Sequence, residues 1–413
     1  MNKPIRWVPT LYFAEGLPFY TVALVAGLMM KSQGVANDVI ARWTSVLGLA
    51  WAFKPLWSPL LELVPNKKAL VVTFEFVGAA ALALAALALH LPGWLSATFV
   101  VLAIVSIASA THDIAADGLY IASLDTRQQA AYAGWQGAFF TAARLAAQGG
   151  LVSLAGRLEQ ASGVTAAWST IFVLLALMMA ALAGWHLWAL PALRSESRAD
   201  ARALFATLAD VIVDFLRKPG IGFAIVFIVL FRAGEGQVQA IGPLFLRDAR
   251  SAGGLGLSTT DVGVVYGTAG TLAFLGGSVL GGYFAAWRGL KRALPWLIVA
   301  MNLPNLVYWW LASARPENLS LIAAALALEM FGYGFGFVGV ILFMMQAVAP
   351  GRYQTAHYAL ATGVMQLGFI VFRAASGDIQ TAFGYERFFL WVLVSALPVL
   401  VLSRFVRLPG EAT

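Results

Sequence analysis

Long, nearly uninterrupted apolar stretches make up most of this chain, and short polar or glycine- and proline-rich segments separate them. A helix of about 20 apolar residues crosses roughly 30 Å of hydrocarbon and satisfies its own backbone hydrogen bonds. The pattern predicts an all-α polytopic membrane protein with twelve transmembrane helices. They are expected at residues 8–30, 43–62, 69–90, 95–123, 131–155, 165–190, 220–247, 260–286, 293–313, 319–348, 355–378 and 386–406.

The longest polar break, residues 191–219, follows the sixth predicted span and divides the chain into six-helix halves at 1–190 and 220–413. Lys and Arg are more frequent in the loops on the side of this break and of both termini, which predicts cytoplasmic termini by the positive-inside rule. The break also predicts an amphipathic helix lying at the membrane surface, with a solvated connector as the alternative. Its apolar positions at helical spacing are Leu204, Leu208, Val211, Ile212 and Phe215.

Composition narrows the possible functions. The 413 residues are 60% hydrophobic and 11% charged, whereas soluble domains are about half apolar and about a quarter charged. The formal charge of +7 resides largely in short loops between spans, so we expect no nucleic-acid partner. The chain has no cysteine, which excludes disulfides, thiolate nucleophiles and cysteine metal ligands.

Ionisable side chains nevertheless occur inside the predicted spans. Each costs about 2.5–3.5 kcal/mol at a helix centre when charged, so each must face a cavity or a partner. Glu75 lies close enough to a span end that its carboxylate is expected to reach the surface. The full set is Glu15, Lys54, Glu75, Asp113, Asp117, Arg144, Arg232, Glu235, Glu329 and Arg373.

Asp113 and Asp117 are four residues apart in SATHDIAADGLY and therefore share one helix face, which Tyr120 continues. Two carboxylates this close repel each other when both are ionised, which favours a bound proton. The alternative is that each acid only holds a cation, such as Arg144 or Lys54, to fix the packing of the helices.

His112 and two proline-containing stretches are weaker candidates. His112 lies about 100° round the helix from Asp113, so it need not join the same cavity. Glu15 precedes Gly16 and Pro18, where a missing proline N–H should loosen the first helix, and Lys54-Pro55 repeats this pattern in the second span.

The second half carries its own candidates. Arg232 and Glu235 are three residues apart in LFRAGEGQVQAIG and either form an intrahelical ion pair or contact a substrate. Gln237 and Gln239 nearby favour a water-filled cavity. Other isolated charges of the second half are Glu329 and Arg373.

Several stretches together resemble the AmpG-type muropeptide permeases and the wider peptide, acetyl-coenzyme A and drug transporter group of the major facilitator superfamily. They occur in order across both halves, which is more specific than any single motif. The resembling stretches are FAEGLP at 13–18, FKPLWSPLLE at 53–62, SATHDIAAD at 109–117, LFRAGE at 230–235, DVGVVYGTAGTLAFLGGSVLGG at 261–282, LEMFGYGFG at 328–336 and TAHYALATG at 355–363.

The resemblance implies a proton-driven importer in a bacterial inner membrane. Its implied cargo is N-acetylglucosamine–anhydro-N-acetylmuramyl peptides, taken into the cytosol from a cavity between the halves, with the proton gradient in place of any cofactor. The family's motif residues fall on Lys54, Asp113, Asp117, Arg144, Arg232, Glu235 and Glu329.

Three departures from the family pattern leave the cargo open. Glu15 stands where the enterobacterial pattern has a small residue, His112 replaces a glutamine, and Tyr120 replaces a lysine. Other members of the group carry siderophores or acetyl-coenzyme A, so a changed cavity is compatible with a changed cargo.

The sequence thus predicts a monomeric proton-coupled symporter with a small amphipathic or glycopeptide cargo, surrounded by lipid and working by alternating access. A siderophore or other organic-anion importer is the alternative. A membrane acyltransferase is disfavoured because no histidine–acid motif lies in a membrane-surface loop and His112 lies inside a span, and a scaffold is disfavoured because it would not need the interior charges. Glu15, Asp113 and Asp117 are the expected proton carriers. The expected cargo contacts are Lys54, Tyr120, Arg144, Arg232, Glu235, Gln239, Glu329 and Arg373.

Overall fold

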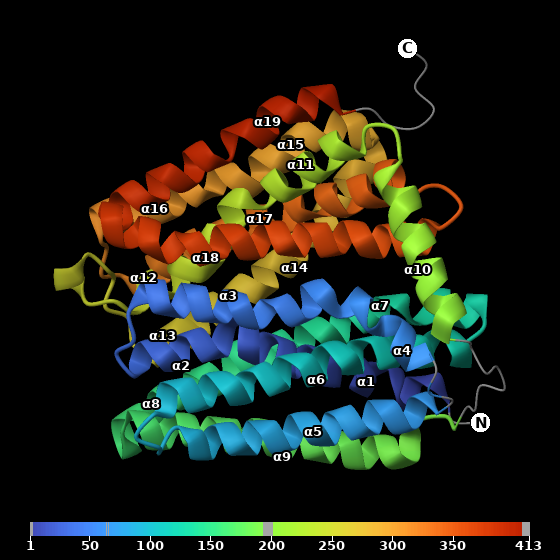
Figure 1. Cartoon of the computed structure of the whole chain (residues 1–413). Helices are drawn as coiled ribbons and strands as arrows, with labels where there is room; N and C mark the ends of the chain where they lie inside the picture. Colours follow the sequence, from blue (N-terminus) through green and yellow to red (C-terminus); the bar gives the residue numbers. More distant parts are fainter. Residues whose placement is uncertain (1–2, 63, 65, 193–200, 407–413) are drawn as a thin grey trace. The chain divides into compact units, whose positions relative to one another are not determined.

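The computed structural model describes residues 3–62, 64, 66–192 and 201–406, and its regular elements are helices (Figure 1). Packing divides the chain into two compact units. The first comprises Met1–Gly34 and Leu47–Ala206, and the second comprises Val35–Val46 and Thr207–Thr413. Among the described residues, ten helical segments are long and apolar enough to cross a membrane.

The first unit is built mainly on α1, α5, α6, α7 and α9. Helix α5 packs against both α6 and α9, and Figure 1 shows these three running side by side. Helix α1 packs against α6 and α7. The helices of this part of the chain are α1 (Val8–Tyr20), α2 (Ala26–Ser32), α3 (Asn37–Phe53), α4 (Ser58–Glu62), α5 (Lys67–Ala88), α6 (Trp94–Ser123), α7 (Thr126–Arg144), α8 (Val152–Ser162) and α9 (Val164–Ala189).

In the second unit α17 packs against α14 and α15, while α18 packs against α11, α12 and α16. The beginning of α3 also belongs to this unit, up to Val46. The remaining helices are α10 (Ala201–Leu216), α11 (Ile221–Phe231), α12 (Ala233–Arg247), α13 (Thr259–Val262), α14 (Gly270–Arg288), α15 (Leu290–Asn302), α16 (Leu306–Ala314), α17 (Leu319–Phe343), α18 (Gln354–Ser395) and α19 (Leu397–Leu402).

Three predicted spans differ from the observed helices. The second, expected at 43–62, begins earlier as α3 and gives way at Lys54 to a 3-10 turn, because Pro55 has no N–H for a further α-helical bond. The eleventh and twelfth are two helical segments joined at Gly384, whose backbone leaves the helical conformation at φ 70° and ψ 171°, and the twelfth continues beyond Ser395 into α19. A single glycine thus replaces the expected loop.

The helix predicted in the polar break exists as α10, although residues 193–200 of the break lie outside the described part. Val211 and Phe215 on its apolar face are buried. Beyond its end, Lys218 donates hydrogen bonds to the carbonyl oxygens of Val348, Ala349 and Pro350. Partial burial lowers the pKa of Lys218, and the nearby Asp214 carboxylate opposes this shift.

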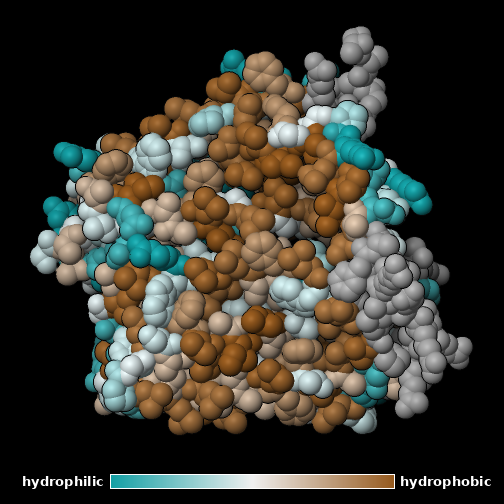
Figure 2. Space-filling model, viewed as in Figure 1, coloured by the Kyte–Doolittle hydropathy of each residue, from teal (hydrophilic) through white to brown (hydrophobic). Residues whose placement is uncertain are grey.

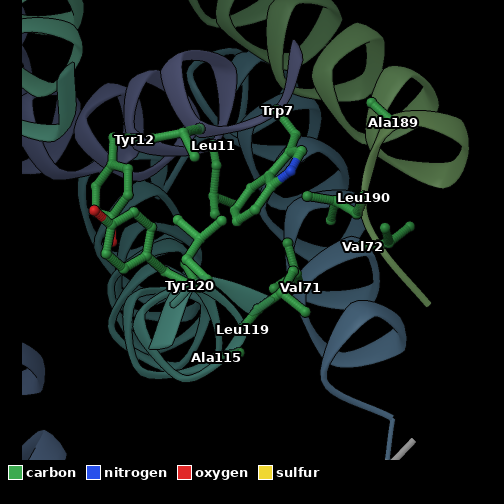
Figure 3. Close-up of a cluster of buried hydrophobic side chains, with 13 residues drawn as sticks. Trp7, Leu11, Tyr12, Val71, Val72, Ala115, Leu119, Tyr120, Ala189 and Leu190 are labelled. Atoms are coloured by element: carbon green, nitrogen blue, oxygen red, sulfur yellow. The ribbon is translucent and has the colours of Figure 1, made fainter. Parts of the chain in front are cut away.

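Apolar side chains both fill the units and cover them. In the first unit Trp7, Leu11, Tyr12, Val71 and Leu119 belong to one buried cluster (Figure 3). Large apolar side chains such as those of Leu87, Val100 and Ile107 are exposed, and hydrophobic residues cover most of the middle of the face drawn in Figure 2. Extensive exposed apolar surface is unfavourable in water and suits contact with lipid.

Glycines set the distance between α14 and α17. A Cβ at Gly277 would lie 2.1 Å from the carbonyl oxygen of Phe331, and one at Gly281 would lie 2.2 Å from that of Phe335. On the other helix, a Cβ at Gly334 would lie 2.1 Å from the carbonyl oxygen of Phe274. The backbones therefore meet at a separation that only glycine permits, as in other membrane helix pairs with small residues every four positions.

Candidate functional site

Three carboxyl groups and one ammonium group come together in the first unit. Oxygen atoms of Glu15, Asp113 and Asp117 all lie within 4.8 Å of one another. The ammonium group of Lys54 forms an ion pair with Asp113. Asp113 is buried, Glu15 and Lys54 are half-buried, and Asp117 is exposed. Three carboxylates could hold a cation in principle, and here Lys54 supplies one.

Local structure explains how these groups meet. Asp113 and Asp117 lie one turn apart on α6, as their spacing predicts. Gly16 follows Glu15 and lets α1 approach α7, because a Cβ there would lie 2.8 Å from the carbonyl oxygen of Phe140. Lys54 begins the 3-10 turn that ends α3. The loosening expected after Pro18 also occurs, as a π-helical turn at Thr21–Val25.

Asp117 has further partners that the sequence did not indicate. The Tyr12 hydroxyl donates a hydrogen bond of 2.9 Å to Asp117, and the Gln136 side-chain amide donates one of 2.6 Å to the same hydroxyl. The chain Gln136–Tyr12–Asp117 links α7, α1 and α6. No spacing pattern joins residues so far apart in the sequence.

Tyr120, a predicted cargo contact, packs against aromatic neighbours. Its ring is buried, meeting Tyr12 edge-on at 5.8 Å and Trp7 at 6.4 Å between ring centroids. Figure 3 shows Tyr120 beside Tyr12 within the apolar cluster. Tyr120 therefore packs the helices together, because its ring lies on the side of α6 that faces α1.

Of the two cations considered as partners for the α6 aspartates, Lys54 forms an ion pair with Asp113. Arg144, at the end of α7, is buried and donates from Nε to Gln148 at 3.2 Å. Its guanidinium carbon lies 6.0 Å from the centroid of the Tyr20 ring. Arg144 remains a predicted cargo contact.

Glu75 does not reach the surface, contrary to expectation. Its side chain is fully buried, and its carboxylate forms hydrogen bonds with His112 and His186. The helices α6 and α9 that pack on α5 provide these partners. His112 therefore points away from the carboxylate cluster, in agreement with its position on the helix.

In the second unit, Arg232 occupies a break between two helices. Its backbone leaves the helical conformation between α11 and α12, at φ −104° and ψ 12°. The guanidinium carbon lies 4.0 Å from the Phe369 ring centroid and 5.1 Å from that of Phe337, and the group donates a 3.2 Å hydrogen bond to Tyr333. Aromatic faces stabilise a buried cation.

The other candidates of this unit lie on several helices. Arg373 on α18 is buried, donates to Thr44 at 3.2 Å, and lies 6.0 Å from the Phe369 ring. Glu235 and Glu329 are buried on α12 and α17, and Gln239 is half-buried. Arg232 and Arg373 are therefore two cations beside one aromatic ring, a site that could attract an anionic group.

Gln237 differs from its neighbour Gln239. Its side chain is fully buried, donates to Ala233 and Ser395, and accepts from Trp391. Protein groups therefore satisfy the Gln237 amide, and the water-filled cavity stays a prediction.

The apolar helices contain paired charges and arginines that lie against aromatic rings. These features define the class of protein as a polytopic membrane protein that handles polar solutes. The sequence model of the Major Facilitator Superfamily matches residues 10–372. The chain belongs to this superfamily and is a transporter, not an enzyme.

Individual relatives agree with this assignment. The chain is 25% identical over 418 residues to the anhydromuropeptide permease of Escherichia coli strain K12, covering 98% of this chain and 79% of that protein. This confirms the resemblance to the AmpG-type permeases. Among solved structures, a D-xylose–proton symporter has a TM-score of 0.73 at 13% identity, with 99% of each chain covered. The D323A mutant of the nucleoside transporter NupG has a TM-score of 0.72 at 16% identity, covering 97% of this chain and 99% of that one.

Proposed function

We propose that this protein is a proton-coupled transporter that imports anhydromuropeptides across a bacterial inner membrane by alternating access, with both termini in the cytoplasm. The observation that carries the proposal is the carboxylate–lysine cluster of Glu15, Lys54, Asp113 and Asp117. The relationship to an anhydromuropeptide permease supports the cargo.

Charge balance favours proton binding at this cluster. Lys54 compensates one carboxylate, which leaves two negative charges if all three acids are ionised. At a separation of 4.8 Å and an effective dielectric constant of about 20, two carboxylates repel by about 3.5 kcal/mol. A bound proton removes this repulsion, and the exposed side chain of Asp117 offers it a route of entry.

The arginines supply attraction for an anionic cargo. Muropeptides carry muramyl or peptide carboxylates, and a guanidinium binds a carboxylate through two parallel hydrogen bonds. Arg232 and Arg373 lie beside Phe369, whose face orients Arg232 without neutralising its charge. We assign Arg232 and Arg373 to cargo binding and Asp117 to proton binding.

Vesicles containing the purified protein provide the test. Labelled anhydromuropeptide should accumulate when an inward proton gradient is imposed and should stop accumulating when a protonophore is added. Siderophore and acetyl-coenzyme A are offered in parallel. Equal uptake with and without the gradient would refute the coupling, and preferential uptake of another compound would refute the cargo.

Two variants separate the roles. Asp117→Asn keeps the side-chain size but removes the charge, so it should abolish gradient-driven accumulation while leaving exchange of labelled for unlabelled cargo intact. Arg232→Ala should abolish both, because cargo binding itself is lost. Loss of exchange in Asp117→Asn, with the protein folded, would place Asp117 at the cargo instead.

A further inference from the structure

A second group of ionisable side chains lies inside the first unit, apart from the carboxylate–lysine cluster. It consists of Glu75 on α5, His112 on α6 and His186 on α9, and at most 2% of each side chain is exposed. One oxygen of Glu75, Oε1, lies 3.1 Å from His112 Nε2 and 2.6 Å from His186 Nδ1. An ionised carboxylate at this depth needs a compensating positive charge.

A neutral imidazole carries one N–H proton, so two neutral histidines beside an ionised Glu75 carry two. Charge balance requires one further proton on the cluster. Without it the cluster would carry a net negative charge in a fully buried position. With it the cluster is neutral, as one imidazolium beside one carboxylate. A further proton would give the cluster a net positive charge, with the same burial cost. The number of bound protons is therefore one.

Hydrogen bonds indicate where this proton resides. His186 Nε2 lies 3.0 Å from the Thr10 hydroxyl, and that hydroxyl donates at 3.2 Å to the carbonyl oxygen of Trp7. A hydroxyl has one proton, so while it donates to Trp7 it accepts from His186. The Nε2 atom of His186 then carries hydrogen. The further proton lies between Nδ1 of His186 and Oε1 of Glu75, whose 2.6 Å separation is shorter than the about 2.7–2.9 Å of ordinary charge-assisted N–H···O bonds. Held at Nδ1, this proton makes His186 the imidazolium.

His112 is the neutral imidazole of the cluster. Its Nδ1 is buried without a hydrogen-bond partner among the described residues. A proton there would bury an unsatisfied N–H group, which is unfavourable. His112 therefore donates from Nε2 to Glu75 and keeps Nδ1 unprotonated.

Other charged groups lie on the same helices and bear on the titration of this cluster. Helix α9 carries none besides His186, and His112 interacts electrostatically with Asp117. The remaining charged side chains of α1, α5 and α6 are Glu15, Lys67, Lys68, Asp113 and Asp117. Helix α8, which packs against α9, carries Arg157 and Glu159. Asp113 has its own cation in Lys54.

We propose that Glu75, His112 and His186 form a second proton-binding site, which holds one proton on His186 and is separate from the Glu15–Asp113–Asp117 cluster. Helix α6 then carries a proton site on each of two faces, at the adjacent residues His112 and Asp113. This bound proton is independent of the cargo and lies outside the carboxylate–lysine cluster.

Nitrogen-15 NMR of histidine-labelled protein in lipid nanodiscs tests the assignment directly, because the chain has only four histidines. At pH 7 we expect the signals of His186 to be those of an imidazolium and those of His112 to be those of a neutral ring protonated at Nε2. The exposed His90 serves as an internal reference. A neutral His186 in the unmodified protein would overturn the proposal.

Two substitutions check the source of the effect. Glu75→Gln keeps an acceptor oxygen but removes the charge, so His186 should lose its imidazolium signal at pH 7. Asp117→Asn should leave that signal unchanged, because the two sites bind protons separately. If Asp117→Asn instead removed the proton from His186, the groups would form one site and the inference would be wrong. The measurement on the unmodified protein decides the question if Glu75→Gln does not fold.

Discussion

Replacing Gly277 by alanine tests the packing of α14 on α17. The added Cβ would lie 2.1 Å from the Phe331 carbonyl oxygen, whereas ordinary van der Waals contact begins at 3.4 Å, so the helices must separate by the difference, about 1.3 Å. Backbone atoms on the facing helix cannot rotate away as a side chain can. Overpacking of this kind costs about 1–3 kcal/mol.

The separation would also reach the candidate site. Helix α17 carries Tyr333, whose hydroxyl accepts a 3.2 Å hydrogen bond from Arg232. A displacement of about 1.3 Å away from α14 is enough to alter this bond. We therefore expect Gly277→Ala to lower both the thermal stability in detergent and the rate of uptake in vesicles.

The neighbouring glycine provides a matched control. Gly276 is exposed, and a Cβ there would meet nothing within 4 Å. Gly276→Ala should therefore be neutral or slightly stabilising, since alanine favours a helix by up to about 1 kcal/mol over glycine. Equal melting temperatures and uptake rates for the two variants would refute the close approach of α14 and α17.

Three other changes have defined outcomes. Lys54→Met leaves Asp113 without its cation, and loss of one partner costs about 3–5 kcal/mol in a fully buried pair and less here because Lys54 is half-buried. Gradient-driven uptake should therefore fall, and Lys54→Arg should keep part of it. Full activity of Lys54→Met would contradict the pairing. Lys218→Met removes the bonds to carbonyls 348–350, so amide hydrogen exchange should accelerate around residues 345–350 and stay unchanged in α5. Gly384→Ala places a side chain at φ 70° and ψ 171°, a conformation that essentially only glycine adopts, in open space. The melting temperature should fall by an amount that corresponds to about 1–3 kcal/mol, and an unchanged melting temperature would contradict this conformation.

Much of the architecture could be predicted from the chain itself. The length of the apolar runs predicts the membrane spans, because hydrocarbon thickness fixes the length of a helix that must satisfy its own backbone. The spacing of Asp113 and Asp117 predicts their shared face for a similarly local reason. Local periodicity predicted α10 as well, and the break expected between residues 378 and 386 contains Gly384, where the backbone leaves the helical conformation.

Partners that lie far apart in the sequence were decided by the tertiary structure. Glu75 was expected near the surface, yet it is buried between His112 and His186, which is 111 residues away. Tyr120 was expected at the cargo, yet it packs against Trp7. Local periodicity gives the face on which a side chain lies but not which helix covers that face. The order and rotation of the packed helices determine those neighbours, and the neighbours determine whether a buried charge is balanced by a histidine, a lysine or a proton.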